Sequence, residues 1–450
     1  MARQLFGTDG VRGRAGDFLT AELALSLART AVARIEHRPG TRAQVLIVRD
    51  TRESGEMLES AIAAGITAGG GDALLGGVLP TPAAPMLVRR HGLQMAVVIS
   101  ASHNPYEDNG IKLFGADGFK LDDETEHEIE DALGQPIPAP DQIGRVHPLH
   151  GALEDYLREL HTRFAGLDLS GRRILLDCAH GATFRAAPEI FRRLGAEVEV
   201  LADEPDGRNI NDGCGSTHLE GAIERVKEGG FELAFAFDGD GDRVLAVDGD
   251  GVVVDGDELV AMAALHLHRQ DRLRGGGVAV TVMTNYGFHT AMREAGVEVA
   301  TTAVGDRYVL DELRKRNWAL GGEQSGHIID LGFGPSGDGI ASALLTLEAL
   351  QGADLRERSA MEKLPQRLVN IRAADRAALS ETMSAAVLTE AIDREQEALT
   401  GRGRVLVRAS GTEPLIRVMV EAPSAQETDD VCGRLSDVVK TVLGDRVAAA

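Results

Sequence analysis

The stretch AQVLIVRDTRESGEMLESAIAAGITAGGGDALLGGVLPTPAAPMLVRRHGLQMAVVIS, residues 43–100, decides the fold because it alternates two kinds of segment. Short apolar runs of strand length are separated by segments whose apolar residues recur at helical spacing. The segments are AQVLIVRD (43–50), MLESAIAAGITAGG (57–70), DALLGGVLP (72–80), PAAPMLVRRHG (82–92) and MAVVIS (95–100). This β-α-β-α-β order is typical of a mainly parallel sheet with helices packed on it.

The same order returns in residues 173–238 and 277–323, at similar segment lengths. After about residue 365 the pattern changes to two strand-like runs around a turn, followed by an amphipathic helix at 425–443. We therefore expect an α/β protein with three tandem mixed α/β domains of similar topology and a smaller C-terminal α+β domain, around a central cleft. The expected domains are residues 1–150, 151–255, 256–365 and 366–450.

Composition and charge exclude several classes of protein. The 450 residues are 43% hydrophobic and 26% charged, which is typical of a globular protein. A net charge of −23 argues against nucleic acid as a partner. No stretch approaches the roughly 18 to 20 apolar residues of a membrane span, and the N-terminus lacks a secretory signal. No glycine precedes a lysine, which excludes a Walker A loop. The number of cysteines, three, is odd, and we expect them to be reduced thiols in a cytoplasmic protein.

A polar loop follows the third strand of each repeat. The loops are ASHNP (101–105), GDGDR (239–243) and GEQSGH (322–327). Ligands of open α/β sheets bind beyond the carboxyl ends of the strands. Three polar loops at equivalent strand ends therefore predict one site assembled from three domains.

The second loop has the strongest individual signal. Asp238, Asp240 and Asp242 alternate with glycines, so a tight turn can direct all three carboxylates to one point. Such carboxylates repel one another unless a divalent cation lies between them. An acidic surface turn is the alternative, and an EF-hand is excluded because its sixth position would be Arg243. We predict an open Mg²⁺ site, with Arg243 beside it to bind a phosphate or neutralise the acids.

The third loop offers Glu323 and Ser325 between two glycines. A carboxylate next to a hydroxyl commonly binds sugar hydroxyls or an amine, although a polar turn is equally compatible with the pattern. His327 at the end of this loop is a candidate catalytic residue, and packing within the loop is the alternative.

The C-terminal domain contains the turn RASGTEPLIR, residues 408–417. Hydroxyls, exposed backbone N–H groups and guanidinium groups together form a cradle for phosphate. A hairpin turn with solvated arginines is the alternative. The cradle residues would be Arg408, Ser410, Gly411, Thr412 and Arg417.

In the first loop, Ser102 follows the strand closely and Lys112 lies ten residues later, where it can fold back to the same site. A serine beside a metal trio and a phosphate cradle suits phosphoryl transfer better than acyl transfer. Arg12, in a glycine-rich segment, is close enough in sequence to reach the same cleft. We expect His103 to point away from Ser102 if the strand pleat continues.

These motifs, in this order, resemble the α-D-phosphohexomutase superfamily over essentially the whole chain. ISASHNP (99–105) is similar to its phosphoserine loop, DGDGDR (238–243) to its metal loop, GEQSGH (322–327) to its sugar-specificity loop and RASGTEP (408–414) to its phosphate loop. FGTDGVRG (6–13) and Gln324 resemble the bacterial branch that acts on glucosamine phosphates.

The resemblance implies interconversion of glucosamine 6-phosphate and glucosamine 1-phosphate, for UDP-N-acetylglucosamine and cell-wall synthesis. It implies a phosphoserine at Ser102, one Mg²⁺ per subunit bound by Asp238, Asp240, Asp242 and a phosphoserine oxygen, and glucosamine 1,6-bisphosphate as intermediate. Lys112 would neutralise charge or move a proton, with Arg12 or His327 assisting. A homodimer is expected, as is usual among such relatives.

Three other functions remain open from the sequence. A phosphomannomutase/phosphoglucomutase would use the same mechanism on another sugar. A metal-dependent phosphosugar hydrolase would release inorganic phosphate instead. A sugar-phosphate-binding protein without catalysis would not need the aspartates and the serine.

Overall fold

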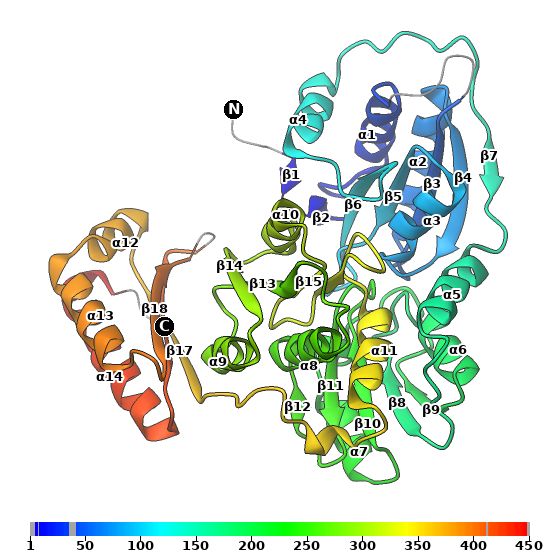
Figure 1. The fold of residues 1–450 in the computed structure, drawn as a ribbon. Coiled ribbons are helices and arrows are strands. Elements are labelled where there is room, and N and C mark those ends of the chain that lie inside the picture. The colour runs from blue at the N-terminus through cyan, green and yellow to red at the C-terminus, as the bar shows by residue number, and fades with distance from the viewer. Residues whose placement is uncertain (1–4, 8, 36–41, 411–412, 448–450) are drawn as a thin grey trace. The chain divides into compact units, whose positions relative to one another are not determined.

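The computed structural model describes residues 5–7, 9–35, 42–410 and 413–447. The chain divides into two compact units, residues 1–283 with 297–358, and residues 284–296 with 359–450 (Figure 1). The first unit contains three sheets and the second contains the C-terminal sheet. None of the described helices is long and apolar enough to cross a membrane.

The first sheet has the strand order β1-β2-β6-β5-β3-β4-β7. β3 pairs in parallel with β4 and with β5, as the repeat predicts, whereas β6 is antiparallel to β5. The strands are β1 (Phe6–Gly7), β2 (Gly10–Arg14), β3 (Gln44–Arg49), β4 (Asp72–Val78), β5 (Met95–Ile99), β6 (Asp108–Gly115) and β7 (Val146–Pro148).

The second and third sheets come from the other two repeats, with the orders β12-β11-β10-β8-β9 and β14-β13-β15-β16. The second contains β8 (Arg173–Asp177), β9 (Glu197–Leu201), β10 (Leu233–Phe237), β11 (Val244–Asp248) and β12 (Val253–Val254). The third contains β13 (Gly277–Thr281), β14 (Glu298–Thr302), β15 (Leu320–Gly322) and β16 (Ile328–Asp330).

All three sheets share one central order. The first strand of each repeat lies between the second and third, and a fourth, antiparallel strand pairs with the third. The β-α-β-α-β pattern predicted the parallel strands but not this fourth one. Each polar loop therefore joins a parallel strand to an antiparallel one, at the same position in each sheet.

Helices cover both faces of the first sheet, and β3 is therefore buried on both sides. Val45 and Ile47 face α1 and α2 in one core cluster, while the alternate residues Leu46 and Val48 are also fully buried. The helices of this unit are α1 (Ala21–Val32), α2 (Gly55–Ala68), α3 (Ala83–His91), α4 (Asp123–Ala132), α5 (Ala152–Arg163), α6 (Ala186–Arg193), α7 (Glu220–Lys227), α8 (Gly256–Arg269), α10 (Asp306–Arg316) and α11 (Gly339–Leu350), with short 3₁₀ turns η1 (Gly215–Thr217), η2 (Arg274–Gly276) and η3 (Leu355–Glu357).

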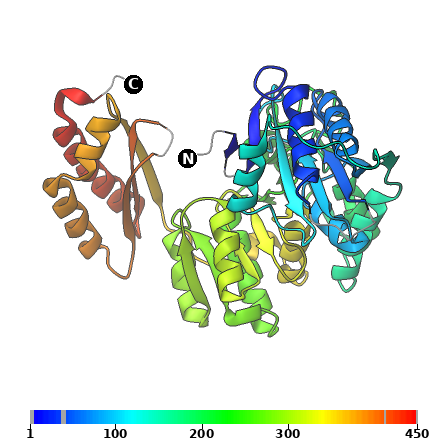
Figure 2. The same cartoon turned by 90° about the horizontal axis from the view of Figure 1, so that it is seen from above.

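The second unit has an antiparallel sheet of order β17-β19-β18, as predicted for the C-terminal domain. Its helices α12, α13 and α14, coloured orange to red in Figure 2, lie on one face of this sheet and share a hydrophobic core with it. The elements are α9 (Tyr286–Ala295), β17 (Gln366–Arg372), α12 (Arg376–Met383), α13 (Ala386–Ala398), β18 (Arg404–Ala409), β19 (Leu415–Glu421), α14 (Ala425–Leu443) and η4 (Gly444–Arg446). The predicted α/β class with a smaller C-terminal domain is confirmed.

Candidate active site

The serine loop, residues 100–105, leaves β5 in an unusual conformation. Ser102 has a φ of 53°, in the left-handed region that few residues other than glycine adopt. The turn is held by Ser100, whose Oγ donates to Asp50 Oδ2 at 2.6 Å and accepts the N–H of Ser102 at 3.0 Å. The Ser102 side chain is 1% exposed, so its position is set by its neighbours.

Two side chains hold the backbone of this loop from behind. Arg52 is almost fully buried and donates from Nη2 to the carbonyl oxygens of Ser102 at 2.9 Å and Asn104 at 2.8 Å. Its Nε pairs with Asp50 at 2.8 Å. Asn211, from the second repeat, donates to the same two carbonyls at 2.9 and 3.1 Å. Neither Arg52 nor Asn211 was predicted from the sequence as a site residue; the charged run RDTR (49–52) directly after an apolar strand is the one signal that marks Arg52.

The hydroxyl of Ser102 points to the metal loop, residues 238–243. Its Oγ donates to Asp238 Oδ2 at 2.5 Å and lies 3.4 Å from His103 Nδ1. The expectation that His103 points away is therefore wrong, because the left-handed turn at Ser102 ends the strand pleat. The first and second polar loops meet at this hydrogen bond.

Asp238, Asp240 and Asp242 form a buried trio in which one ligand oxygen from each lies within 4.8 Å of the others. Burial and the charges of Asp242 and Asp240 raise the pKa of Asp238 well above its usual value. Asp240 Oδ1 and Asp242 Oδ1 are buried and have no hydrogen-bond partner among the described residues. Crowded carboxylates with unused oxygens suit a hard divalent cation. The trio therefore fits the predicted Mg²⁺.

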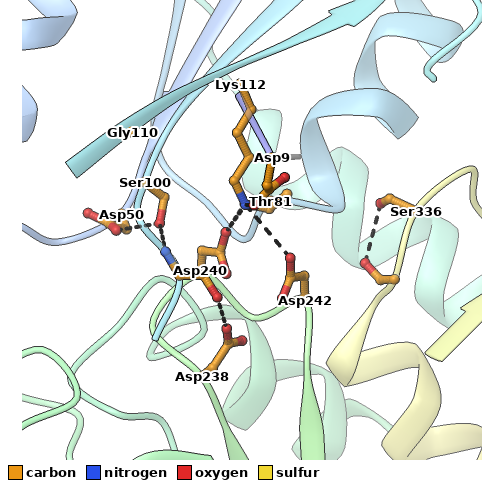
Figure 3. A network of polar contacts seen from close by, with 12 residues as sticks. Asp9, Asp50, Thr81, Ser100, Gly110, Lys112, Asp238, Asp240, Asp242 and Ser336 are labelled. Atoms are coloured by element: carbon orange, nitrogen blue, oxygen red, sulfur yellow. Dashed lines mark hydrogen bonds and ion pairs between the residues drawn. The ribbon is translucent and has the colours of Figure 1, made fainter. Parts of the chain in front are cut away.

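Lys112 extends from β6 to the same trio (Figure 3). It lies opposite Val98 of β5, so the antiparallel fourth strand brings it back to the serine loop. Its Nζ is 2.8 Å from Asp240 Oδ2, 3.0 Å from Asp9 Oδ2 and 3.7 Å from Asp242 Oδ2. Although burial opposes it, the charges of Asp240 and Asp9 raise the pKa of Lys112 above its usual value. This cation is therefore suited to neutralising charge.

His327, at the end of the sugar loop (residues 322–327), lies against the other side of the trio. Its Nδ1 is 3.6 Å from Asp242 Oδ1. Although burial opposes it, the charge of Asp242 raises the pKa of His327 to about 9. A protonated imidazole at this position can donate a proton. All three polar loops thus lie around Asp242 and Asp238, as the shared strand-end position predicted.

A cavity of about 490 Å³ opens beside the trio. Arg12 lies on its wall, paired with Asp9, and Arg243 lies there with its Nε 3.9 Å from Asp242 Oδ1. The cavity is lined by Leu5, Gly7, Asp9, Gly10, Arg12, Asp242, Arg243, Val304, Gly305, Asp306, Glu323, Ser325 and His327. The predicted residues Arg12, Arg243, Glu323, Ser325 and His327 are brought together here. Asp9 and Asp306 were not predicted, because no strand-end pattern marks them.

The predicted phosphate cradle lies in the second unit. Arg408 of β18 is directly opposite Arg417 of β19, and burial together with the Arg417 charge lowers the pKa of Arg408. The buried Arg417 Nε has no hydrogen-bond partner among the described residues. The Ser410 N–H donates to the carbonyl of Leu415 at 2.8 Å. Gly411 and Thr412 lie outside the described residues. Two adjacent guanidiniums with an unused donor are suited to an anion.

Known protein families match this chain along most of its length. Models of the phosphoglucomutase/phosphomannomutase family match in four parts: alpha/beta/alpha domain I at residues 3–136, domain II at 147–251, domain III at 255–368 and the C-terminal domain at 368–438.

Curated relatives extend the match to nearly full length. A phosphoglucosamine mutase of Pelotomaculum thermopropionicum is 49% identical over 446 residues, covering 97% of this chain and 99% of the relative. One of Mycobacterium tuberculosis is 47% identical with the same coverage. Among solved structures, a phosphoglucomutase/phosphomannomutase family protein from Burkholderia thailandensis superposes with a TM-score of 0.82 at 22% identity, over 97% of each chain. The chain therefore belongs to the phosphoglucomutase/phosphomannomutase family of the α-D-phosphohexomutases, together with the curated phosphoglucosamine mutases.

Proposed function

We propose that this protein is a phosphoglucosamine mutase that interconverts glucosamine 6-phosphate and glucosamine 1-phosphate. The observation that carries the proposal is the 2.5 Å hydrogen bond from Ser102 Oγ to Asp238 of the carboxylate trio. A hydroxyl at a carboxylate trio, next to a buried lysine and a cavity of about 490 Å³, suits phosphoryl transfer through a phosphoserine. The two curated phosphoglucosamine mutases, 49% and 47% identical to this chain, support the choice of an amino sugar.

We propose that Asp238, Asp240, Asp242 and an oxygen of phosphorylated Ser102 hold one Mg²⁺ per subunit. Mg²⁺ supplies Lewis-acid polarisation of the transferred phosphoryl group. Asp240 Oδ1 has no hydrogen-bond partner among the described residues, and Thr81 fixes the position of this carboxylate by donating to Asp240 Oδ2 at 2.6 Å.

In the proposed reaction, O1 of glucosamine 6-phosphate attacks the phosphorus of phosphorylated Ser102, and the bond from phosphorus to Ser102 Oγ breaks. The O1 proton leaves to solvent or to a neighbouring base, the departing Ser102 Oγ takes up a proton, and glucosamine 1,6-bisphosphate is formed. After this intermediate turns round, Ser102 Oγ gives up its proton and attacks the 6-phosphoryl group, the bond from phosphorus to O6 breaks, and O6 takes up a proton. Lys112 neutralises the transferred charge, while His327 or Arg12 assists proton transfer and charge balance.

The remaining residues are proposed to bind and orient the substrate. Glu323 and Ser325 bind sugar hydroxyls from the cavity wall, and Arg243 binds a phosphate oxygen there. Arg408, Ser410, Gly411, Thr412 and Arg417 hold the phosphate that is not reacting. Domains 1–150, 151–255, 256–365 and 366–450 thus supply the serine, metal, sugar and phosphate functions in turn.

We further propose a cytoplasmic homodimer with phosphosugar substrates and without nucleic acid or membrane partners. The free thiols of Cys178, Cys214 and Cys432 are typical of a reducing compartment. The net charge of −23 disfavours nucleic acid.

The test is a coupled assay with glucosamine, glucose and mannose 6-phosphates. We expect kcat/KM to be highest for glucosamine 6-phosphate. A tenfold preference for mannose or glucose would favour a phosphomannomutase/phosphoglucomutase, and release of inorganic phosphate at the rate of substrate loss would favour a hydrolase. Intact mass of the purified protein tests the phosphoserine separately, through an added mass of about 80 Da on Ser102 that sugar phosphate removes.

A further inference from the structure

Helix α10 begins on the wall of the cavity with Asp306. The preceding residue, Gly305, has a φ of 134°, and its N–H donates to Glu323 Oε1 at 2.9 Å. This bond fixes the start of α10 to the sugar loop. The Asp306 carboxylate is therefore positioned on the cavity wall by the same loop that carries Glu323 and Ser325.

Asp306 is a half-buried carboxylate with polar neighbours. Its Oδ1 accepts its neighbour Arg307 N–H at 2.8 Å, and its Oδ2 is 2.6 Å from Lys120 Nζ. Although burial opposes it, the charges of Lys120 and His327 lower the pKa of Asp306. Lys120 also pairs with Asp9, so one lysine is shared by two carboxylates. A carboxylate has about four acceptor positions, so Asp306 can accept a further donor from the cavity.

The other acids of the cavity have their own partners. Asp242 belongs to the metal trio. Asp9 already contacts three cations: Arg12, Lys112 and Lys120. Asp306 contacts two cations, Lys120 at 2.6 Å and His327 Nε2 at 3.9 Å, which is one fewer than Asp9. Glu323 forms no ion pair with the described residues and accepts the Gly305 N–H.

The sugar phosphates that compete for this cavity differ at C2. Glucosamine 6-phosphate carries an ammonium group there, and glucose 6-phosphate a hydroxyl. In a partly buried site a fixed negative charge favours a cation far more than a neutral group of similar size. In the proposed function Glu323 and Ser325 of the sugar loop bind sugar hydroxyls. Asp306 is then the carboxylate of the cavity wall that is available for the ammonium group, because its two oxygens have acceptor positions besides those used by Arg307 N–H and Lys120.

We propose that Asp306 is the specificity-determining residue for the amino sugar, with its carboxylate binding the C2 ammonium group of the substrate. This inference rests on the proposed function. The role of Lys120 is to hold Asp306 toward the cavity and to balance the charge of Asp9 and Asp306 before substrate binds.

The test compares Asp306→Asn with the unmodified enzyme on glucosamine 6-phosphate, glucose 6-phosphate and 2-deoxyglucose 6-phosphate. We expect kcat/KM for glucosamine 6-phosphate to fall at least tenfold and the values for the two neutral sugars to change by less than threefold. Asp311→Asn, an exposed site on the same helix, is the matched control and should change none of them. Asp306→Glu keeps the charge and should retain more of the amino-sugar preference than Asp306→Asn.

The outcomes separate the two proposals. If the unmodified enzyme prefers a neutral sugar, the proposed function fails whatever the variants do. If the unmodified enzyme prefers glucosamine 6-phosphate, but Asp306→Asn lowers kcat/KM equally for all three substrates or for none of them, the inference about Asp306 is overturned and the proposed function stands. A loss of kcat/KM confined to glucosamine 6-phosphate in Glu323→Gln, and absent in Asp306→Asn, would also overturn the inference about Asp306. Melting temperatures of all variants show whether Asp306→Asn is folded; if it is not, Asp306→Glu carries the comparison.

Discussion

Arg52 Nη2 lies 2.9 Å from the carbonyl oxygen of Ser102, and this contact explains how a serine is held in a left-handed turn. The left-handed conformation costs about 1–2 kcal/mol for a residue with a side chain. Arg52 and Asn211 offset that cost by satisfying buried carbonyl oxygens of the loop. They hold the backbone on one side and leave Ser102 Oγ directed at Asp238 on the other.

Replacing Asn211 by alanine should impair turnover more than binding. Arg52 still donates to both carbonyls, so we expect a loss of about 1–2 kcal/mol in stability. The serine loop becomes less well positioned, so kcat should fall about tenfold while KM changes by less than twofold. Steady-state kinetics and urea unfolding measure both effects. Asp212→Ala, an exposed neighbour, is the control, and a raised KM with normal kcat would contradict the positioning role.

Replacing Ser102 by glycine should stabilise the fold relative to replacement by alanine. Both variants lack the hydroxyl, so we expect neither to carry phosphate or catalyse the reaction. Only glycine adopts a φ of 53° without cost, so Ser102→Gly should be about 1 kcal/mol more stable than Ser102→Ala. Urea unfolding and intact mass check this, and phosphate on either variant would place the modification elsewhere.

Replacing Asp238 by asparagine should separate the stability of the metal-free protein from its stabilisation by Mg²⁺. Burial and two neighbouring carboxylates disfavour the charge of Asp238, so the metal-free variant should be at least as stable as the metal-free parent. Mg²⁺ at 100 times its Kd should stabilise the parent by about 2.7 kcal/mol and the variant much less. Thermal melts with EDTA or Mg²⁺ measure this. Equal stabilisation of both proteins would exclude the trio as the metal site.

The repeat and the three polar strand-end loops were predictable because strand and helix periodicity is local. Once three sheets of one topology are expected, Ser102, the aspartate trio and the sugar loop follow from their position after the third strand. The sequence predicted that Lys112 lies near the serine loop, but not the strand that carries it there. The pattern of apolar residues in β6 does not distinguish an antiparallel strand from a parallel one.

Arg52, Asn211 and Asp306 could not be found in this way. Each acts through a contact with another repeat or with another loop: Asn211 with the serine loop, Asp306 with Lys120 of the first domain. Such contacts depend on how loops of one domain, or folded domains, face one another, and a single sequence carries no periodic signal for that. In the sequence, Asp306 cannot be distinguished from an ordinary acidic residue in the first turn of a helix.

Replacing Arg417 by alanine should weaken substrate binding. Arg408 and Arg417 are paired across β18 and β19, and burial together with the Arg417 charge lowers the pKa of Arg408. We expect KM to rise about tenfold with kcat within threefold, because the non-reacting phosphate is bound in both ground and transition states. Arg402→Ala, an exposed arginine of the same domain that pairs with Glu427, is the control. An unchanged KM would count against the cradle.

Asp338 should make stability depend on pH in a direction opposite to an ordinary surface carboxylate. It is buried, caps α11 by accepting the Ala341 N–H at 2.9 Å, and lies 3.0 Å from the Tyr156 hydroxyl. Burial raises its pKa from 3.8 to about 6. Because the folded-state pKa is raised, the unfolded chain loses this proton first. Stability from protonated Asp338 is present below about pH 4 and is lost as pH rises through 6, by about 3 kcal/mol in all.

Asparagine at this position keeps the cap and cannot ionise. The stability of Asp338→Asn relative to the parent should therefore increase between pH 4 and 7, which urea unfolding at several pH values measures. Asp375→Asn removes the charge of an exposed helix cap, with Ala378 N–H at 2.7 Å, and serves as control. A constant difference between Asp338→Asn and the parent across this range would show that folding does not raise the pKa of Asp338, and would contradict this prediction.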